Sequence, residues 1–268
     1  STLVSYVDFA GNWHTQGICA VLALIGLFVT AVLYIKGVKG SILIGILVTW
    51  VLGMLAQAAG IYTVDAENGF YSLYPAMAMT DFSAIGNTFG QCFQADFSGV
   101  GIFNFVVVLL SFLFVDMFDT IGTLIGVSSK AGMLDKDEKL PRIRPALLAD
   151  AIATSVGAIF GTSTTTTFVE SSAGVGEGAR TGLASVVTGL LFLLAIFFAP
   201  IFTAIPGFAT APALIFVGFL MVSAILNVDF EDAAEAIPAY LCMIAMPLVY
   251  SISEGIALGV ISYVVIHV

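Results

Sequence analysis

Two aspartates, Asp116 and Asp119, lie within an apolar run at 101–127 that is long enough to cross a bilayer as a helix. A carboxylate near the centre of a membrane helix costs about 3 kcal/mol on insertion scales, so such groups usually face a bundle interior and contact a substrate, an ion or a proton path. On a helix, Thr120 and Thr123 share one face with both aspartates. The run therefore predicts a polar stripe on an apolar helix.

A further acid, Glu170, follows a threonine-rich sequence at 162–167. Consecutive β-branched threonines disfavour a helix and predict a short extended segment, and the Ser/Ala/Gly-rich residues after Glu170 predict a half-helix. Interrupted segments of this kind indicate the binding site of a transporter, because non-helical backbone at membrane depth must be buried or line a cavity. Glu170 would begin the half-helix, where free N–H groups and the helix dipole stabilise negative charge.

These groups could bind a neutral ligand that carries N–H donors and carbonyl or imine acceptors on a flat apolar ring. A carboxylate can accept from two such donors, while backbone N–H groups and threonine hydroxyls serve the acceptors. Phe114, Phe118 and Phe168 could cover the ring face, and packing against lipid or protein is the alternative interpretation of these side chains.

The composition indicates an integral membrane protein, with 59% hydrophobic residues, 10% charged residues and a mean hydropathy of +1.08. Its three cysteines show no C-x-x-C spacing, which argues against a disulfide framework or a metal cluster. His14 precedes the first span and His267 ends the last, and no HExxH sequence occurs, so neither an enzyme nor a metal site is expected.

Apolar windows of about 20 residues divide the chain into membrane segments. The expected spans are 17–35, 41–59, 101–127, 181–199, 211–226, 237–250 and 252–266. The segment 146–160, which carries Asp150, is too short to span a bilayer alone. Near the last spans, Ser251 and Glu254 have the spacing of a capping box, and Asp229 and Asp232 also look like helix-capping acids.

Five of the eight basic residues lie in the loop 128–144, and two more lie in the loop 36–40. The positive-inside rule places both loops in the cytoplasm of a plasma-membrane protein. The stretch 60–100 is then extracellular, and it contains acids but no Lys or Arg, namely Asp65, Glu67, Asp81 and Asp96.

Three sequences together resemble the hallmark segments of a known family: FVDMFDTIGTLIGV at 114–127, ADAIAT at 149–154 and GTSTTTTFVESSAGVGEGARTG at 161–182. They are similar to the AzgA-type guanine/hypoxanthine (purine) permeases of the nucleobase–cation symporter 2 superfamily. The resemblance runs along nearly the whole chain.

The resemblance implies an all-α polytopic membrane protein with part of a 7+7 inverted-repeat fold, in which a short extended strand leads into a half-helix. The chain would begin near the end of the fifth segment, so we expect a fragment of a permease that lacks the N-terminal segments. The implied domains are gate helices of the first repeat with an extracellular loop (1–100), a core domain with the substrate site (101–199) and gate helices of the second repeat (200–268).

The resemblance also assigns the site, with Glu170 at the strand-to-half-helix junction and Asp116 on the helix that faces it. Asp119 is either a second ligand or part of a proton relay. The expected substrate contacts are Asp116, Asp119, Thr120, Thr165, Thr166, Phe168 and Glu170. Burial favours the protonated form of a carboxylic acid. The candidate proton carriers are therefore Asp116, Asp119, Asp150 and Glu170.

The predicted function is import of purine nucleobases (guanine, hypoxanthine or adenine) by proton symport, with no cofactor; sodium coupling stays open. The alternatives are a different nucleobase such as xanthine or uracil, an anion, a channel, or a transport-inactive fragment. The expected partners are the purine, the lipid bilayer and a second copy bound through gate helices. A net charge of −10 argues against nucleic acid.

Overall fold

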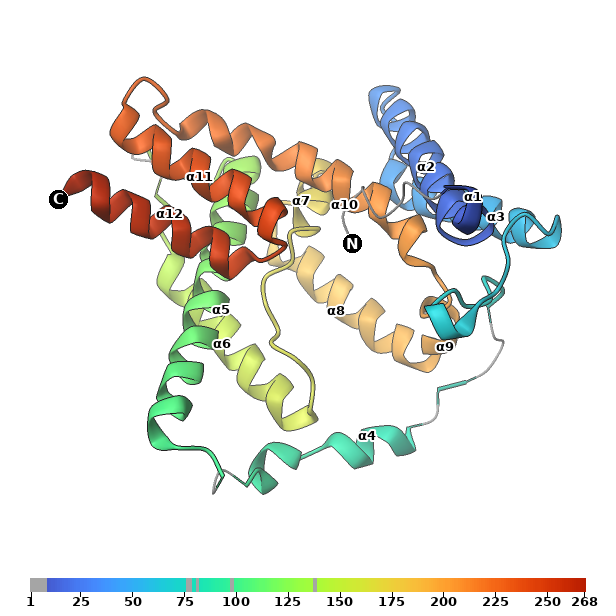
Figure 1. Ribbon diagram of the computed structural model, residues 1–268, viewed down its shortest axis with the longest axis horizontal. Coiled ribbons are helices and arrows are strands. Elements are labelled where there is room, and N and C mark those ends of the chain that lie inside the picture. Colours follow the sequence, from blue (N-terminus) through green and yellow to red (C-terminus); the bar gives the residue numbers. More distant parts are fainter. Residues whose placement is uncertain (1–8, 76–78, 81, 97–98, 137–138) are drawn as a thin grey trace. The chain divides into compact units, whose positions relative to one another are not determined.

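The computed structural model describes residues 9–75, 79–80, 82–96, 99–136 and 139–268, and its named elements are helices (Figure 1). Asp81, one of the acids expected outside the membrane, is not among the described residues. Among the described residues, four helices are long and apolar enough to cross a membrane. They are Trp13–Ile35, which comprises η2 (Trp13–Gly17) and α2 (Ile18–Ile35), α3 (Ser41–Ala58), α5 (Ile102–Ala131) and α6 (Ile143–Phe160).

The shorter apolar helices are α8 (Gly182–Phe197), α10 (Gly207–Met221), α11 (Ala233–Val249) and α12 (Ile252–His267). The remaining elements are α1 (Phe9–Asn12), η3 (Ala66–Asn68), α4 (Ser83–Thr88), η4 (Gln91–Gln94), α7 (Ser171–Gly176), α9 (Ala199–Phe202) and η5 (Val222–Asn227). These elements confirm the prediction of an all-α polytopic membrane protein.

The segment that carries Asp150 is longer than predicted. Helix α6 begins at Ile143 instead of residue 146, and its 18 residues extend about 27 Å, which approaches the thickness of the hydrocarbon core. Arg144 and Pro145 lie in its first turn, where proline is tolerated because its missing N–H has no helical partner. The expectation that this piece is too short to span a membrane is therefore wrong.

The helices form two compact units, of which the first runs up to Ser83 and includes Glu170–Leu220, and the second combines Ala84–Val169 with Met221–Val268. This grouping by contact differs from the division into core and gate domains, which concerns movement during transport. That division stays a prediction.

In the first unit, α2 and α3 pack through two reciprocal glycine–threonine contacts. A Cβ added to Gly26 would collide with Thr49 Oγ1, and a Cβ added to Gly45 would collide with Thr30 Oγ1. Both hydroxyls bond within their own helix, since Thr30 donates to the Gly26 carbonyl at 2.8 Å and Thr49 to the Gly45 carbonyl at 2.7 Å. The helices therefore approach closely while both threonine hydroxyls keep their hydrogen bonds.

The chain after α3 folds back onto this helix pair. Trp50 Nε1 donates to the Leu73 carbonyl at 2.9 Å, and the Leu73 N–H donates to Gln57 Oε1 at 2.8 Å. Tyr62, 4% exposed, donates from its hydroxyl to the Tyr71 carbonyl at 2.9 Å, and burial raises the pKa of this phenol to about 12. These bonds order the first part of the acidic stretch, whose structure the composition left open.

In the second unit, the end of α6 contacts residues 88–90 of the acidic stretch 60–100. The Gly90 N–H donates to the Ile159 carbonyl at 2.7 Å, and Thr88 Oγ1 donates to the Phe160 carbonyl at 3.1 Å. The rings of Phe89 and Phe160 meet edge to face at 5.3 Å. The C-terminal end of α6 thus lies with residues from 60–100, which agrees with the alternation of the predicted loops across the membrane.

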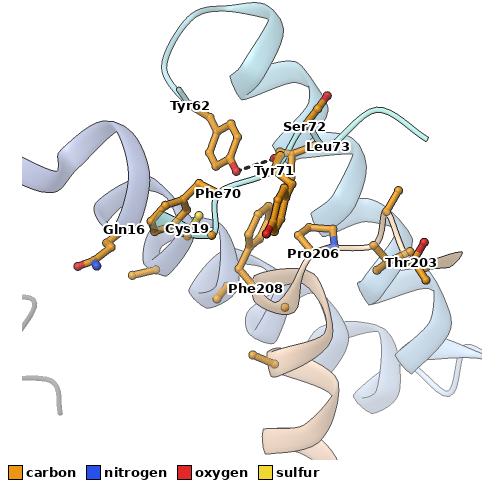
Figure 2. Close-up of a pocket in the computed structure, with 17 residues that line it drawn as sticks. Gln16, Cys19, Tyr62, Phe70, Tyr71, Ser72, Leu73, Thr203, Pro206 and Phe208 are labelled. Atoms are coloured by element: carbon orange, nitrogen blue, oxygen red, sulfur yellow. Dashed lines mark hydrogen bonds between the residues drawn. The ribbon is translucent and has the colours of Figure 1, made fainter. Parts of the chain in front are cut away.

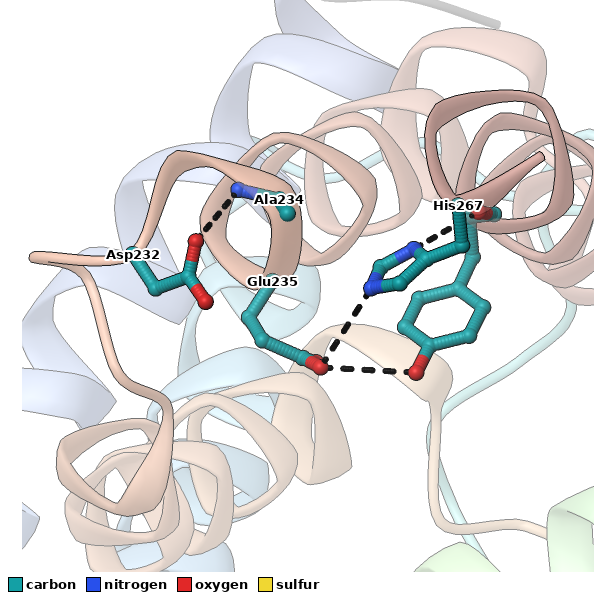
Figure 3. Close-up of polar contacts among 5 residues, drawn as sticks. Asp232, Ala234, Glu235 and His267 are labelled. Carbon is teal, nitrogen blue, oxygen red and sulfur yellow. Dashed lines mark hydrogen bonds and ion pairs between the residues drawn. The ribbon is translucent and has the colours of Figure 1, made fainter.

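Helices α11 and α12 form a closely packed pair in the second unit, and Asp232 and Ser251 cap their N-termini as predicted, whereas Asp229 lies before α11 and caps no described helix. Asp232 accepts from the Ala234 N–H at 2.9 Å (Figure 3). At the start of α12, Ser251 Oγ accepts from the Glu254 N–H at 3.3 Å. Asp229 accepts from the Glu231 N–H at 2.9 Å. Figure 3 also shows Glu235, which accepts from the Tyr263 hydroxyl at 3.4 Å.

Candidate functional site

The polar stripe on α5 is present in the second unit. Asp116 and Asp119 are half-buried on this helix, and Thr120 and Thr123 are 1% and 5% exposed. The first part of α5 is exposed and apolar, so the change from exposed to buried begins near the first aspartate. The stripe therefore faces protein along its length, as expected for functional carboxylates in a membrane helix.

Asp150 of α6 accepts two hydrogen bonds from threonine hydroxyls. Thr120 Oγ1 donates to its Oδ2 at 2.9 Å, and Thr167 Oγ1 donates to its Oδ1 at 3.3 Å. This carboxylate joins α5, α6 and the threonine-rich segment. Its predicted use as a proton carrier stays a prediction.

Residues 162–168 are not helical, as the run of threonines predicted. The short strand that the resemblance implied is not formed there, because the one bridge-type pairing within the described residues joins Asp65 to Phe70. The segment runs back along α6: the Thr162 N–H donates to the Gly157 carbonyl at 3.0 Å, and further on Thr154 Oγ1 donates to the Thr165 carbonyl at 3.1 Å.

Gly157 allows this close approach. A Cβ at this position would lie 2.7 Å from Thr165 Oγ1 and 2.9 Å from Thr162 Oγ1. Thr162 and Thr165 thus lie against this part of α6, and Thr167 reaches Asp150 on the same helix. The sequence reasoning selected Thr165 and Thr166 and missed Thr167. Thr166 is half-buried, and its contact with substrate stays a prediction.

Asp116 differs from Asp150 in its hydrogen bonding. Its Oδ1 is buried, and the described residues provide no hydrogen-bond partner for it. The carboxylates of Asp119 and Asp150 lie close enough to interact with it electrostatically. A buried acceptor without a partner costs about 1–3 kcal/mol, so this oxygen is suited to accept from a donor on a bound ligand or to hold a proton.

The aromatic candidates near this site are accessible. Phe168 is 60% exposed. Phe114 and Phe118 stack on each other, one helical turn apart, with ring centroids 6.3 Å apart. Their faces could cover a planar ligand, and this role stays a prediction.

Glu170 belongs to the first unit. It is the N-cap residue of α7, as predicted, but its side chain makes no capping hydrogen bond and is exposed. Its predicted contact with the purine stays a prediction.

Comparison with known proteins gives a consistent assignment. The Permease family matches residues 4–258. The guanine/hypoxanthine permease PbuO of Bacillus subtilis is 42% identical over 262 residues, which are 96% of this chain and 56% of that protein. The adenine permease AdeP of Escherichia coli is 40% identical over 268 residues, which are 100% of this chain and 55% of that protein.

The chain thus spans about half the length of these relatives. Its membrane helices, the polar stripe of α5 and the interrupted segment after α6 all lie within the matched residues. The chain therefore belongs to the Permease family, a family of multi-pass membrane transporters and not of enzymes.

Proposed function

We propose that this protein transports purine nucleobases into the cell across the plasma membrane, in symport with protons. The observation that carries the proposal is the buried, unpartnered Oδ1 of Asp116 in the described part of the chain, beside the carboxylate of Asp150 that two threonines hold in place. The names of the relatives PbuO and AdeP support guanine, hypoxanthine or adenine as substrates.

The chemistry of the site favours a neutral base over an anion. The acids Asp116, Asp119 and Asp150 gather at the polar stripe, and an anion there would be repelled by their negative charge. A neutral purine offers N–H groups that a carboxylate can accept, and the exposed ring of Phe168 could lie against its face. We also assign Glu170 as an acceptor for an N–H group of the purine.

Proton coupling is supported by the same geometry. A buried carboxylate that lacks hydrogen-bond donors is more stable when it is protonated, so Asp116 can hold a proton until the site opens to water. Asp119 and Glu170 are the other candidate carriers.

Uptake of radiolabelled hypoxanthine by the full-length protein, expressed in cells that lack their own purine permeases, tests the proposal. We expect saturable uptake that guanine or adenine inhibits and that a protonophore abolishes. Stronger competition by xanthine or uracil would change the substrate assignment. Dependence on sodium in place of a proton gradient would contradict the coupling, and non-saturating flux would indicate a channel.

A further inference from the structure

A cavity of about 650 Å³ lies within the first unit and is lined by none of the site residues described above (Figure 2). Its lining comes from the N-terminal part of the Trp13–Ile35 helix, from residues 62–73 after α3, and from the turn between α9 and α10. This volume falls in the usual range for small-molecule sites. The predicted topology places the chain after α3 outside the membrane, so the cavity would open to the extracellular side.

Aromatic side chains form much of the cavity wall, and close packing on α3 holds one of them, Phe208, in place. Phe70, Tyr71 and Phe208 surround the cavity in Figure 2. Phe208 packs so closely on α3 that a Cβ on Gly53 would lie 2.8 Å from its Cζ. The hydrogen bond from Tyr62 fixes the backbone of Tyr71. The Phe208 side of the wall is therefore preformed and loses little freedom when a flat ring binds against it.

Polar groups in the lining are available to a ligand. The side-chain amide of Gln16 and the hydroxyl of Tyr71 have no hydrogen-bond partner among the described residues, and the Tyr71 side chain is 67% exposed. Ser72 Oγ accepts from Gln57 Nε2 at 3.2 Å, which orients this hydroxyl. An amide offers both a donor and an acceptor, which matches the edge of a nitrogen heterocycle and would be left unpaired against a lipid chain.

We propose that this cavity is a second binding site for a neutral, planar nitrogen heterocycle, distinct from the site at Asp116. The identity of the ligand as a purine rests on the proposed function. A purine would lie against the aromatic wall with its polar edge toward Gln16 and Ser72, on the side from which substrate arrives.

Protection of an introduced cysteine tests this proposal. In full-length protein with Cys19, Cys92 and Cys242 replaced by serine, the variant Ser72→Cys reports from the cavity. Glu67→Cys is the matched control, because Glu67 is exposed in the same stretch but does not line the cavity. A membrane-impermeant methanethiosulfonate labels either cysteine from outside, with and without hypoxanthine.

We expect hypoxanthine at about ten times its dissociation constant to slow labelling of Ser72→Cys about tenfold by occupancy, with no effect on Glu67→Cys. Protection must persist when Asp116→Asn is added, because that change disables the other site. Thr203→Cys, on another part of the lining, is a second reporter if Ser72→Cys disturbs folding. Ribose, which is polar but not a planar aromatic ring, should not protect.

Four results would overturn the proposal: no labelling from outside, no protection at Ser72→Cys and Thr203→Cys, equal protection of the control, or protection that disappears with Asp116→Asn. The last result would show that occupancy of the Asp116 site merely closes the cavity. Absence of purine uptake with intact protection would refute the transport function and not the cavity site. Normal purine uptake without protection of the cysteine would refute the cavity site and leave the transport function standing.

Discussion

Thr120 Oγ1 donates a 2.9 Å hydrogen bond to Asp150 Oδ2, and this bond joins α5 to α6 at the level of the polar stripe. Thr167 donates to the other oxygen of the same carboxylate, so Asp150 connects three segments. Asp116 lies one turn before Thr120 on α5. Its buried Oδ1 accepts no hydrogen bond from any described residue. The two carboxylates therefore differ: Asp150 joins three segments, whereas one oxygen of Asp116 has no partner among the described residues.

Replacing Thr120 by valine should destabilise the protein. The substitution conserves shape but removes the donor to Asp150, which leaves a carboxylate oxygen unpaired at a cost of about 1–3 kcal/mol. Thermal unfolding in detergent should show a lower midpoint. Thr123→Val is the matched control, because Thr123 is buried on the same helix and makes no hydrogen bond to Asp150 in the described structure. Equal shifts for the two variants would argue against the role of the Thr120 bond.

Asp116→Asn should impair transport more than folding. The amide keeps the size of the side chain but places a donor where the carboxylate offered an acceptor, and it cannot carry a proton. Loss of a charged hydrogen bond of about 1.5–3 kcal/mol corresponds to about 10- to 150-fold weaker binding of purine. Initial uptake rates across a range of hypoxanthine concentrations measure this change.

Asp232→Asn serves as the control for that variant, because it makes the same chemical change at a helix cap where asparagine also functions. Its uptake should match that of the unmodified protein. Normal uptake by Asp116→Asn would remove this carboxylate from the mechanism.

Gly45→Ala should separate α2 from α3. The added methyl group collides with Thr30 Oγ1, and the Thr30 backbone lies close behind, so the helices must move apart at a cost of about 1–3 kcal/mol. Gly189→Ala is the control, since a Cβ on Gly189 meets no atom within 4 Å and alanine favours a helix. A fluorescence-based thermal shift should place Gly45→Ala well below Gly189→Ala; the reverse order would contradict the close contact.

Asp232→Ala should destabilise the start of α11 by about 1 kcal/mol, because the Ala234 N–H loses its acceptor. The Asp232→Asn variant should retain most of the stability, since its side-chain oxygen can accept the same bond. Protease sensitivity of the loop before α11 provides the measurement. Identical digestion of both variants would show that the cap contributes little.

The sequence predicted the membrane helices well where the composition is uniformly apolar. The span expected at 41–59 is found at Ser41–Ala58, and that expected at 252–266 is found at Ile252–His267. The start of α6 was predicted three residues too late, because Arg144 and Pro145 interrupt the hydropathy signal although neither breaks the first turn. Hydropathy thus located the helices better than their ends.

The candidate site was predicted only in part. Spacing alone grouped Asp116, Asp119, Thr120 and Thr123 on one face, because helical periodicity is local. The partnership of Thr167 with Asp150 depends on how the extended segment folds back along α6, which no local pattern specifies. The fold-back of residues 62–73, which creates the cavity, likewise depends on distant partners such as Trp50.

The glycine–threonine seam between α2 and α3 also bears on how the chain assembles during synthesis. The two helices are separated by only five residues, so bringing them together costs little chain entropy, and their hydroxyls are already bonded when they enter lipid. Helices α11 and α12 repeat this arrangement, with Gly255 against Met246 and Gly259 against Cys242 across a two-residue connection. We therefore expect two hairpins to form early in the bilayer, each as a local nucleus within its own unit.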